Sequence, residues 1–309
     1  MKLETRPLSD GVGVEVIGLD AGALADDRET RRALDAIFVD KGVLLFRGMG
    51  DSIETHLALS RCFGELERHP VKEVWVEGHP ELIDLVTKPP EDGRPISPVY
   101  QVDGQARAGW LPWHADLFYM SRINRGGILR AVQIPSEGGK TGFIDRIRLY
   151  DTLPERTKAR IDGLSVVYKF HPDMAVQKFG MIDGLKLLAS SKILDNLIAR
   201  LETDFPPVVH PMVYTQAETG RKVLNVSPLH VTGIEGMADA EAEPLLTEIV
   251  DHCTSPRHAY YHDWAENDLM LWDNWRTLHS AEGVPVHCKR LMQRTTIRGD
   301  YALGRQLPH

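Results

Sequence analysis

The chain has 309 residues and a formal net charge of −8. An acidic balance without a lysine- or arginine-rich run argues against a nucleic-acid partner. No segment reaches the about 18 apolar residues of a membrane-spanning helix, and the first residues lack the apolar core of a signal peptide. The three cysteines, Cys62, Cys253 and Cys288, show no zinc-type spacing. We therefore expect a protein of the reducing cytoplasm without a membrane partner.

Residues 30–41 are predicted to form a helix with Leu34, Ile37 and Phe38 on one side, ending at Gly42. A buried strand is predicted over 43–46 and a second helix over 52–63. Further short strands are predicted at 128–134, 164–168, 223–226, 258–264, 269–272 and 291–297, with helical stretches near 146–160, 191–203 and 239–253. Many short strands with turn residues between them favour a β-sandwich or barrel decorated by helices. The length allows two domains, but barrels of this size also fold as one, so we expect a single domain over residues 1–309.

Two segments are expected to stand apart from the sandwich. The segment from Thr87 to Pro112 is rich in proline, glycine and polar residues and precedes the first candidate metal ligand. A long irregular segment beside a site is often a lid, so we predict an active-site lid at about 87–112. A surface loop is the alternative. We also expect a helical insertion at about 172–207.

Three side chains have the chemistry of an iron site. His114 and Asp116 lie in a stretch with aromatic residues typical of a strand, and residues two apart in a strand share a face. His279 would come from another strand. Two imidazoles and one carboxylate leave three positions of Fe(II) open, enough for a chelating oxoacid and dioxygen. We therefore predict His114, Asp116 and His279 as metal ligands and as the catalytic centre.

A second His-x-Asp pair, His171 and Asp173, competes with the first. Pro172 stands between its members, and proline cannot donate a hydrogen bond to a sheet ladder. A turn near the surface is therefore the expected structure there, and His114 with Asp116 is the favoured pair.

Two arginines near the C-terminus are candidates for binding anions. If residues 290–297 form a strand, Arg290 and Arg294 project to the same side. The planar fork of arginine suits the distal carboxylate of 2-oxoglutarate, and two inward arginines are costly without anionic partners. In the alternative, both arginines face solvent while Leu291, Gln293 and Thr295 face the core, where Gln293 fits poorly.

Together these features resemble the taurine dioxygenase and 2,4-dichlorophenoxyacetate dioxygenase family of Fe(II)/2-oxoglutarate-dependent oxygenases. The similarity covers nearly the whole chain, through the segments 42–48, 63–66, 113–116, 138–143, 234–237, 272–274 and 294–297. It implies a mainly β fold with flanking helices, a double-stranded β-helix or jelly roll. It also implies Fe(II), with 2-oxoglutarate and O2 as cosubstrates.

The resemblance also assigns roles by spacing. Thr141 lies 27 positions after His114, where the family uses a threonine hydroxyl on the distal carboxylate of 2-oxoglutarate. Arg290 lies 11 positions after His279, where the family places its carboxylate-binding arginine. Arg294 follows at 15 positions, where taurine dioxygenase has an arginine that helps to hold the substrate anion.

The substrate pocket departs from that of taurine dioxygenase. His69 matches a histidine that contacts the taurine sulfonate, but the tyrosine expected next is Lys72 here. The asparagine expected four residues before the first iron ligand is Trp110, and a pocket aromatic is replaced near His230. A taurine pocket is therefore not expected.

The same positions indicate what the pocket would accept instead. Arg294, His69 and Lys72 suit an anionic group, while Trp110 and Phe118 could form apolar walls. A packed aromatic residue or a solvated lysine is the alternative at each of these positions.

We therefore predict a dioxygenase that hydroxylates a C–H bond of a small, anionic organic molecule, giving succinate and CO2. A hydroxylase or desaturase of a natural-product intermediate is the alternative within this class. A zinc hydrolase and a non-catalytic jelly-roll binding protein are alternatives outside it, but neither needs a distal-carboxylate site such as Arg290 with Thr141. The expected partner is a small molecule, and homo-oligomerisation stays open.

Overall fold

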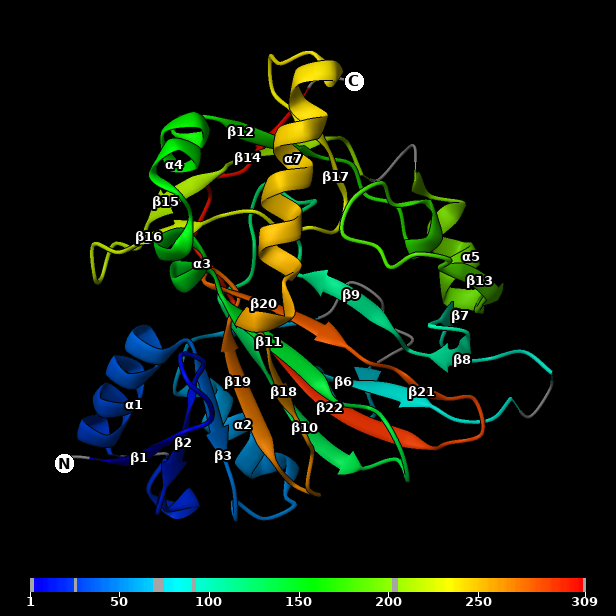
Figure 1. Cartoon of the computed structure of the whole chain (residues 1–309). Helices are drawn as coiled ribbons and strands as arrows, with labels where there is room; N and C mark the ends of the chain where they lie inside the picture. Colours follow the sequence, from blue (N-terminus) through cyan, green and yellow to red (C-terminus); the bar gives the residue numbers. More distant parts are fainter. Residues whose placement is uncertain (1–2, 25–26, 69–74, 91–92, 202–204, 308–309) are drawn as a thin grey trace.

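The computed structural model describes residues 3–24, 27–68, 75–90, 93–201 and 205–307 (Figure 1). Its largest sheet has nine strands. The strands follow the order β1 (Glu4–Pro7), β2 (Val14–Ile17), β3 (Val43–Phe46), β19 (Leu269–Asp273), β10 (Gly126–Gln133), β22 (Arg290–Ile297), β6 (His79–Thr87) and β5 (Trp75–Val76), with β4 (Leu66–Glu67) also pairing with β22. Strands β2 and β3 run parallel, and β22 is antiparallel to β10 and β6.

A second sheet has the order β18 (Tyr260–His262), β11 (Thr141–Asp145), β20 (Thr277–Ala281) and β9 (Leu111–His114). Phe143 of this sheet packs against Trp272, Leu129 and Met292 of the large sheet. The ring centroids of Phe143 and Trp272 are 6.5 Å apart. Two sheets that bury such a shared layer form the jelly-roll core, and the mainly β prediction is confirmed.

Smaller sheets extend the core. They consist of β17 (Val231–Ile234), β12 (Ser165–Tyr168), β14 (Val208–Pro211) and β23 (Arg305–Gln306); of β13 (Lys186–Ala189), β7 (Val99–Val102), β8 (Gln105–Ala108) and β21 (Val284–Pro285); and of β15 (Val213–Thr215) with β16 (Lys222–Leu224). The helices are η1 (Ala21–Leu24), α1 (Arg28–Lys41), α2 (Ile53–Arg61), α3 (Arg146–Thr152), α4 (Glu155–Ile161), η3 (Met174–Val176), α5 (Lys192–Ile198), α7 (Asp239–Thr254) and η4 (Pro256–His258).

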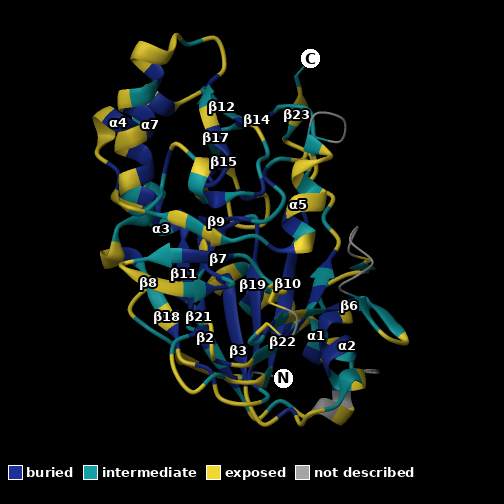
Figure 2. Ribbon diagram, turned by 90° about the vertical axis from the view of Figure 1, so that its right-hand side faces the viewer, coloured by how far each residue is buried: buried dark blue, intermediate teal, exposed yellow. Residues whose placement is uncertain are grey.

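Helices α1 and α2 cover the outer face of the large sheet. Leu34 and Phe38 of α1 and Leu59 of α2 pack with Phe46 and Ile128 of the strands. The helix α1 ends as predicted at Gly42, whose φ of 72° is a left-handed conformation that glycine adopts without steric cost. In Figure 2 the strands are largely buried, while the outer faces of α4, α5 and α7 are exposed.

The two segments expected to stand apart from the sandwich are more regular than predicted. Residues 87–112 contain the β7–β8 hairpin, in which Val99 pairs with Ala108, and the start of β9. The hairpin also pairs with β13 and β21. Residues 172–207 contain η3, β13 and α5, so that segment holds a strand as well as helical turns.

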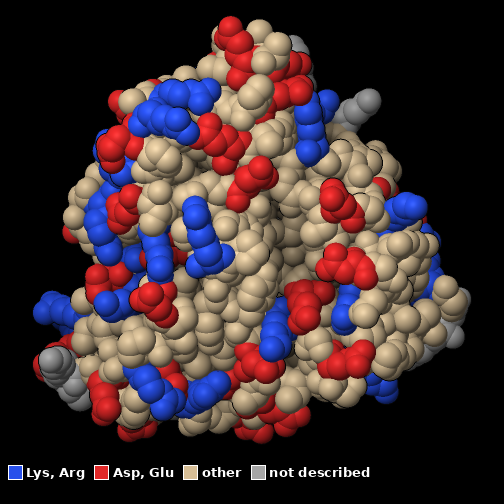
Figure 3. Space-filling model, in the orientation of Figure 1, with Lys and Arg blue, Asp and Glu red and all other residues tan. Residues whose placement is uncertain are grey.

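On the face shown in Figure 3, acidic and basic side chains are interspersed. Within the described residues, no helix is long and apolar enough to cross a membrane.

Candidate active site

Two histidines from neighbouring strands face each other. His114 at the end of β9 pairs directly with His279 of β20, and their ring centroids are 4.1 Å apart. His114 Nδ1 lies 2.8 Å from the carbonyl oxygen of Pro112. A carbonyl can only accept, so Nδ1 carries the proton and Nε2 keeps its lone pair for a metal.

Asp116 completes the group, but from a turn. Strand β9 ends at His114 and residues 116–119 form a turn, so the prediction of one strand carrying both ligands is wrong. Oδ1 of Asp116 still lies 3.8 Å from Nε2 of His114 and 3.7 Å from Nε2 of His279. Over the described part of the chain, this is the only group of three such side chains with metal-ligand geometry.

Burial and charge give each of the three side chains the protonation state that a metal ligand needs. Burial lowers the pKa of His114 and lowers that of His279 well below its usual value, so both rings are neutral at pH 7. Burial opposes ionisation of Asp116, but the charge of Arg294, the neighbouring His279 and His114, and the hydrogen bond from Arg294 together outweigh burial and hold the pKa of Asp116 below its usual range. Neutral imidazoles and an ionised carboxylate suit Fe(II).

Arg294 contacts this carboxylate directly. Nη2 of Arg294 lies 2.5 Å from Oδ2 of Asp116, and its guanidinium stacks 5.0 Å from the ring of Trp272. Oδ1 faces the two histidines and also lies 3.4 Å from Nη1 of Arg294, while Oδ2 makes the shorter contact with the arginine. The sequence predicted an anionic partner for Arg294 but did not indicate that Asp116 is that partner.

Arg290 projects from the same face of β22, as predicted, and lines the same cavity as Arg294. Its buried Nε has no hydrogen-bond acceptor among the described residues. Burial alone lowers the pKa of Arg290 to about 10, which leaves the side chain charged at pH 7. A half-buried cation whose buried Nε–H has no acceptor among the described residues is suited to bind a carboxylate.

Thr141 of β11 lines this cavity as well. Its Oγ1 lies 3.0 Å from the indole nitrogen of Trp264, which can only donate. The hydroxyl hydrogen of Thr141 is therefore free to point to another acceptor, such as a carboxylate.

The cavity that these residues share measures about 390 Å³. Its lining includes Thr141, Arg290 and the His-Asp-His group. The lining is otherwise largely apolar and includes Tyr100, Trp110, Met174, Leu194 and Leu197. A smaller cavity of about 200 Å³ also reaches His114, Asp116 and Arg294, and its further walls include Tyr119, Leu229 and His230.

The predicted substrate residues separate into three groups. Trp110 lines the larger cavity, and His230 lines the smaller one. Phe118 lies elsewhere: its side chain is 1% exposed and packs in the core against Tyr168. The turn after Asp116 directs it inward, so it does not wall either cavity. His69 and Lys72 lie outside the described residues.

Several lining residues were not anticipated. Tyr100 donates to Asp173 and accepts from the amide of Met174, which ties β7 to η3 beside the cavity. Tyr119 is half-buried with its ring against His230, and burial raises its pKa to about 12. The sequence signal that could have identified Tyr119 as a lining residue is its position three residues after Asp116. Asp173 caps η3, consistent with the turn predicted there.

A jelly-roll fold with a His-Asp-His group beside an arginine whose Nε has no acceptor in the described part of the chain is that of the Fe(II)/2-oxoglutarate-dependent oxygenases. The family model "Taurine catabolism dioxygenase TauD, TfdA family" matches residues 4–296, and the chain belongs to this family. It is a non-haem dioxygenase that uses Fe(II), 2-oxoglutarate and O2.

Individual relatives agree. The chain is 30% identical over 298 residues to (S)-phenoxypropionate/alpha-ketoglutarate-dioxygenase of Sphingobium herbicidovorans, covering 96% of this chain and 93% of the relative. It is 30% identical over 312 residues to alpha-ketoglutarate-dependent 2,4-dichlorophenoxyacetate dioxygenase of Cupriavidus pinatubonensis, covering 97% and 99%. A taurine dioxygenase structure from Burkholderia xenovorans aligns with a TM-score of 0.74 at 26% identity, covering 100% and 96%.

Proposed function

We propose that this dioxygenase hydroxylates a C–H bond in a small organic molecule with an acidic group and an apolar body. The observation that carries the proposal is the shared cavity. It brings the His-Asp-His group, the unpartnered Nε of Arg290 and a largely apolar wall into one space.

Three sets of residues have separate roles in binding the metal, the cosubstrate and the substrate. His114, Asp116 and His279 hold Fe(II), while Arg290 and Thr141 hold the distal carboxylate of 2-oxoglutarate. When bound, the metal and its cosubstrates supply the oxidation and yield succinate and CO2. The protein positions the substrate. Trp110 and Tyr100, whose rings are 6.1 Å apart, form part of the apolar wall of the cavity that the His-Asp-His group also lines.

The acidic group of the substrate is assigned to Arg294. Its Nε is buried without an acceptor in the described residues, although Nη1 and Nη2 face Asp116. The relatives named above act on phenoxypropionate and 2,4-dichlorophenoxyacetate, both of which are acids. His230 lines the smaller cavity together with Arg294, and His69 and Lys72 are further candidates for binding the acidic group by resemblance alone. Taurine is not the expected substrate, because Trp110 replaces a smaller polar residue.

A neutral substrate, such as a natural-product intermediate, is the second candidate. The contact between Arg294 and Asp116 favours it, because the arginine already has a counter-ion and does not need a substrate anion. Hydroxylation and desaturation would both suit this candidate.

A substrate panel separates the two candidates. Aryloxyacids, alkyl sulfates, sulfonates and the neutral amide of each acid are incubated with Fe(II) and 2-oxoglutarate, and succinate and oxidised product are measured together. We expect well-coupled turnover of acids and poor turnover of their amides and of taurine. Coupled turnover of amides equal to that of the acids would contradict the anionic assignment, and sulfite release from taurine would contradict the pocket assignment.

We also propose a cytoplasmic location, supported by three free thiols at Cys62, Cys253 and Cys288. Homo-oligomerisation stays a proposal that a sedimentation measurement would decide. The zinc hydrolase and binding-protein alternatives both predict no oxygen consumption dependent on 2-oxoglutarate.

A further inference from the structure

The backbone around Asp116 is held by side chains from distant parts of the sequence. Because β9 ends at His114, the sheet does not fix the next two residues. The hydroxyl oxygen of Ser227 accepts a hydrogen bond from the amide of Ala115 at 3.1 Å. Asn274 contacts both backbone groups of Asp116. Its Oδ1 accepts a hydrogen bond from the amide of Asp116 at 2.7 Å, and its Nδ2 donates to the carbonyl of Asp116 at 3.0 Å.

The orientation of the Asn274 amide follows from its neighbours. Asn124 donates through its own Nδ2 to the carbonyl of Gly126 at 3.0 Å, which leaves its Oδ1 as an acceptor. Nδ2 of Asn274 donates to that Oδ1 at 2.9 Å. The other end of the Asn274 amide is therefore the oxygen, as an acceptor for the Asp116 amide requires.

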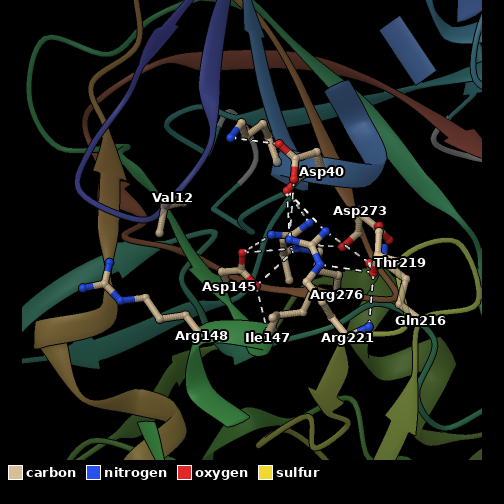
Figure 4. A network of polar contacts seen from close by, with 12 residues as sticks. Val12, Asp40, Asp145, Ile147, Arg148, Gln216, Thr219, Arg221, Asp273 and Arg276 are labelled. Atoms are coloured by element: carbon tan, nitrogen blue, oxygen red, sulfur yellow. Dashed lines mark hydrogen bonds and ion pairs between the residues drawn. The ribbon is translucent and has the colours of Figure 1, made fainter. Parts of the chain in front are cut away.

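The turn that carries Asn274 is itself fixed. Arg276 forms a buried ion pair with Asp145 and donates to the carbonyl of Asp40 at the end of α1 (Figure 4). Asp273 pairs with Arg125 at 2.6 Å. These contacts join the turn to α1 and β11, and Asn274 is 0% exposed. A rigid turn can hold its side chain in one place.

We propose that Asn274 is a positioning residue for the metal centre. It holds the main chain of Asp116, while Arg294 holds the carboxylate. The same turn leads into β20, which carries His279 five residues later. One buried turn thus sets two of the three ligands. The inference rests on the proposed function only in taking Asp116 as a ligand.

Loss of the Asn274 amide is expected to release the Asp116 turn and weaken metal binding. Groups that orient metal ligands typically contribute 10- to 100-fold to affinity, so we expect Asn274→Ala to weaken Mn(II) binding by roughly that factor. Asn225→Ala is the matched control. Asn225 is also 0% exposed and bridges Arg146 and the carbonyl of Pro211, but no hydrogen bond joins it to Asp116.

The experiment measures three quantities on the full chain: the Mn(II) dissociation constant, the absorption spectrum of bound Co(II), and thermal unfolding without metal. We expect both alanine variants to unfold earlier, but only Asn274→Ala to lose metal affinity and alter the Co(II) spectrum. Equal Mn(II) affinities in the two variants, with unchanged spectra, would overturn the proposal. If Asn274→Ala does not fold, Asn124→Ala replaces it, and affinity equal to that of Asn225→Ala would be equally decisive.

The variant Asp116→Ala distinguishes the positioning role of Asn274 from the assignment of Asp116 as a metal ligand. If Asp116→Ala binds Mn(II) as the wild type does, the ligand assignment fails. If it loses Mn(II) while Asn274→Ala does not, only the positioning role fails.

Discussion

Arg294 contacts both oxygens of the Asp116 carboxylate, with Nη2 2.5 Å from Oδ2 and Nη1 3.4 Å from Oδ1. Held in this way, the carboxylate presents Oδ1 to the two histidines, 3.8 Å from Nε2 of His114 and 3.7 Å from Nε2 of His279. An arginine that resemblance assigns to a substrate anion thus also contacts Asp116, a proposed metal ligand. The two roles differ in what a substitution should change.

Replacing Arg294 by Ala should remove this support and leave Asp116 buried without its counter-ion. We expect Mn(II) affinity to fall roughly 10- to 100-fold, as for other groups that orient metal ligands. If Arg294 also binds the substrate anion, the preference in kcat/KM for an acid over its amide should fall too. Titration of metal and a two-substrate assay measure both effects. Unchanged Mn(II) binding would exclude the supporting role.

Replacing Arg290 by Ala should weaken 2-oxoglutarate binding with little effect on metal. Loss of one partner of a buried charge pair costs about 2–5 kcal/mol, because the carboxylate is left without its cation. Direct binding of 2-oxoglutarate to the Mn(II) protein is the appropriate measurement, since KM need not equal a dissociation constant. An unchanged dissociation constant would rule out Arg290 as the carboxylate site.

Trp264→Phe tests whether the indole orients the Thr141 hydroxyl. Loss of one ordinary hydrogen bond should weaken 2-oxoglutarate binding by about 0.5–1.5 kcal/mol, and Thr141→Ala by about 0.5–3 kcal/mol. Because the indole is expected to act through the hydroxyl, Trp264→Phe should have almost no further effect once Thr141 is alanine. Fully additive effects in the double variant would argue that Trp264 contributes only packing.

Stability should fall as the solution becomes acidic, in part because of His56. Burial lowers the pKa of His56 to about 3, and its Nε2 lies 3.1 Å from the carbonyl of Ile128. The unfolded side chain titrates near about 6.5, so the unfolded state binds more protons below that pH. The contribution of His56 to the free energy of unfolding is therefore complete above about pH 6.5 and is lost as the pH falls toward 3. At pH 5 this loss amounts to about 2 kcal/mol.

Denaturant unfolding of the metal-free protein at pH 7 and pH 5 measures this loss. His56→Gln should reduce the difference between the two pH values, whereas His287→Gln, at an exposed position, should not. An identical pH dependence in wild type and His56→Gln would show that His56 does not contribute.

The sequence predicted the elements whose signals are local. The apolar stripe of α1 with its stop at Gly42, the buried β3 and the inward face of β22 all follow from periodicity and glycine chemistry. The sequence also predicted that His114 and His279 lie together, because both histidines stand in motifs of the family that the chain resembles.

Other features depend on contacts between distant residues and could not be predicted. The end of β9 at His114 is set by Ser227 and Asn274, which satisfy the backbone of the turn. Phe118 lies within that turn, and its side chain packs in the core instead of the pocket. Gln293, judged a poor core residue, is buried because Arg130 and Asp84 satisfy its amide. Such long-range pairings have no local pattern.

The central claim is that His114, Asp116 and His279 form one Fe(II) site that drives 2-oxoglutarate-dependent oxidation. The most direct measurement is anaerobic Fe(II) binding followed by succinate formation on admission of oxygen, for wild type and Asp116→Ala. We predict one Fe(II) per chain and succinate in the wild type, and loss of most iron affinity and of succinate formation in a folded Asp116→Ala variant. Full iron binding with coupled succinate formation in Asp116→Ala would contradict the account.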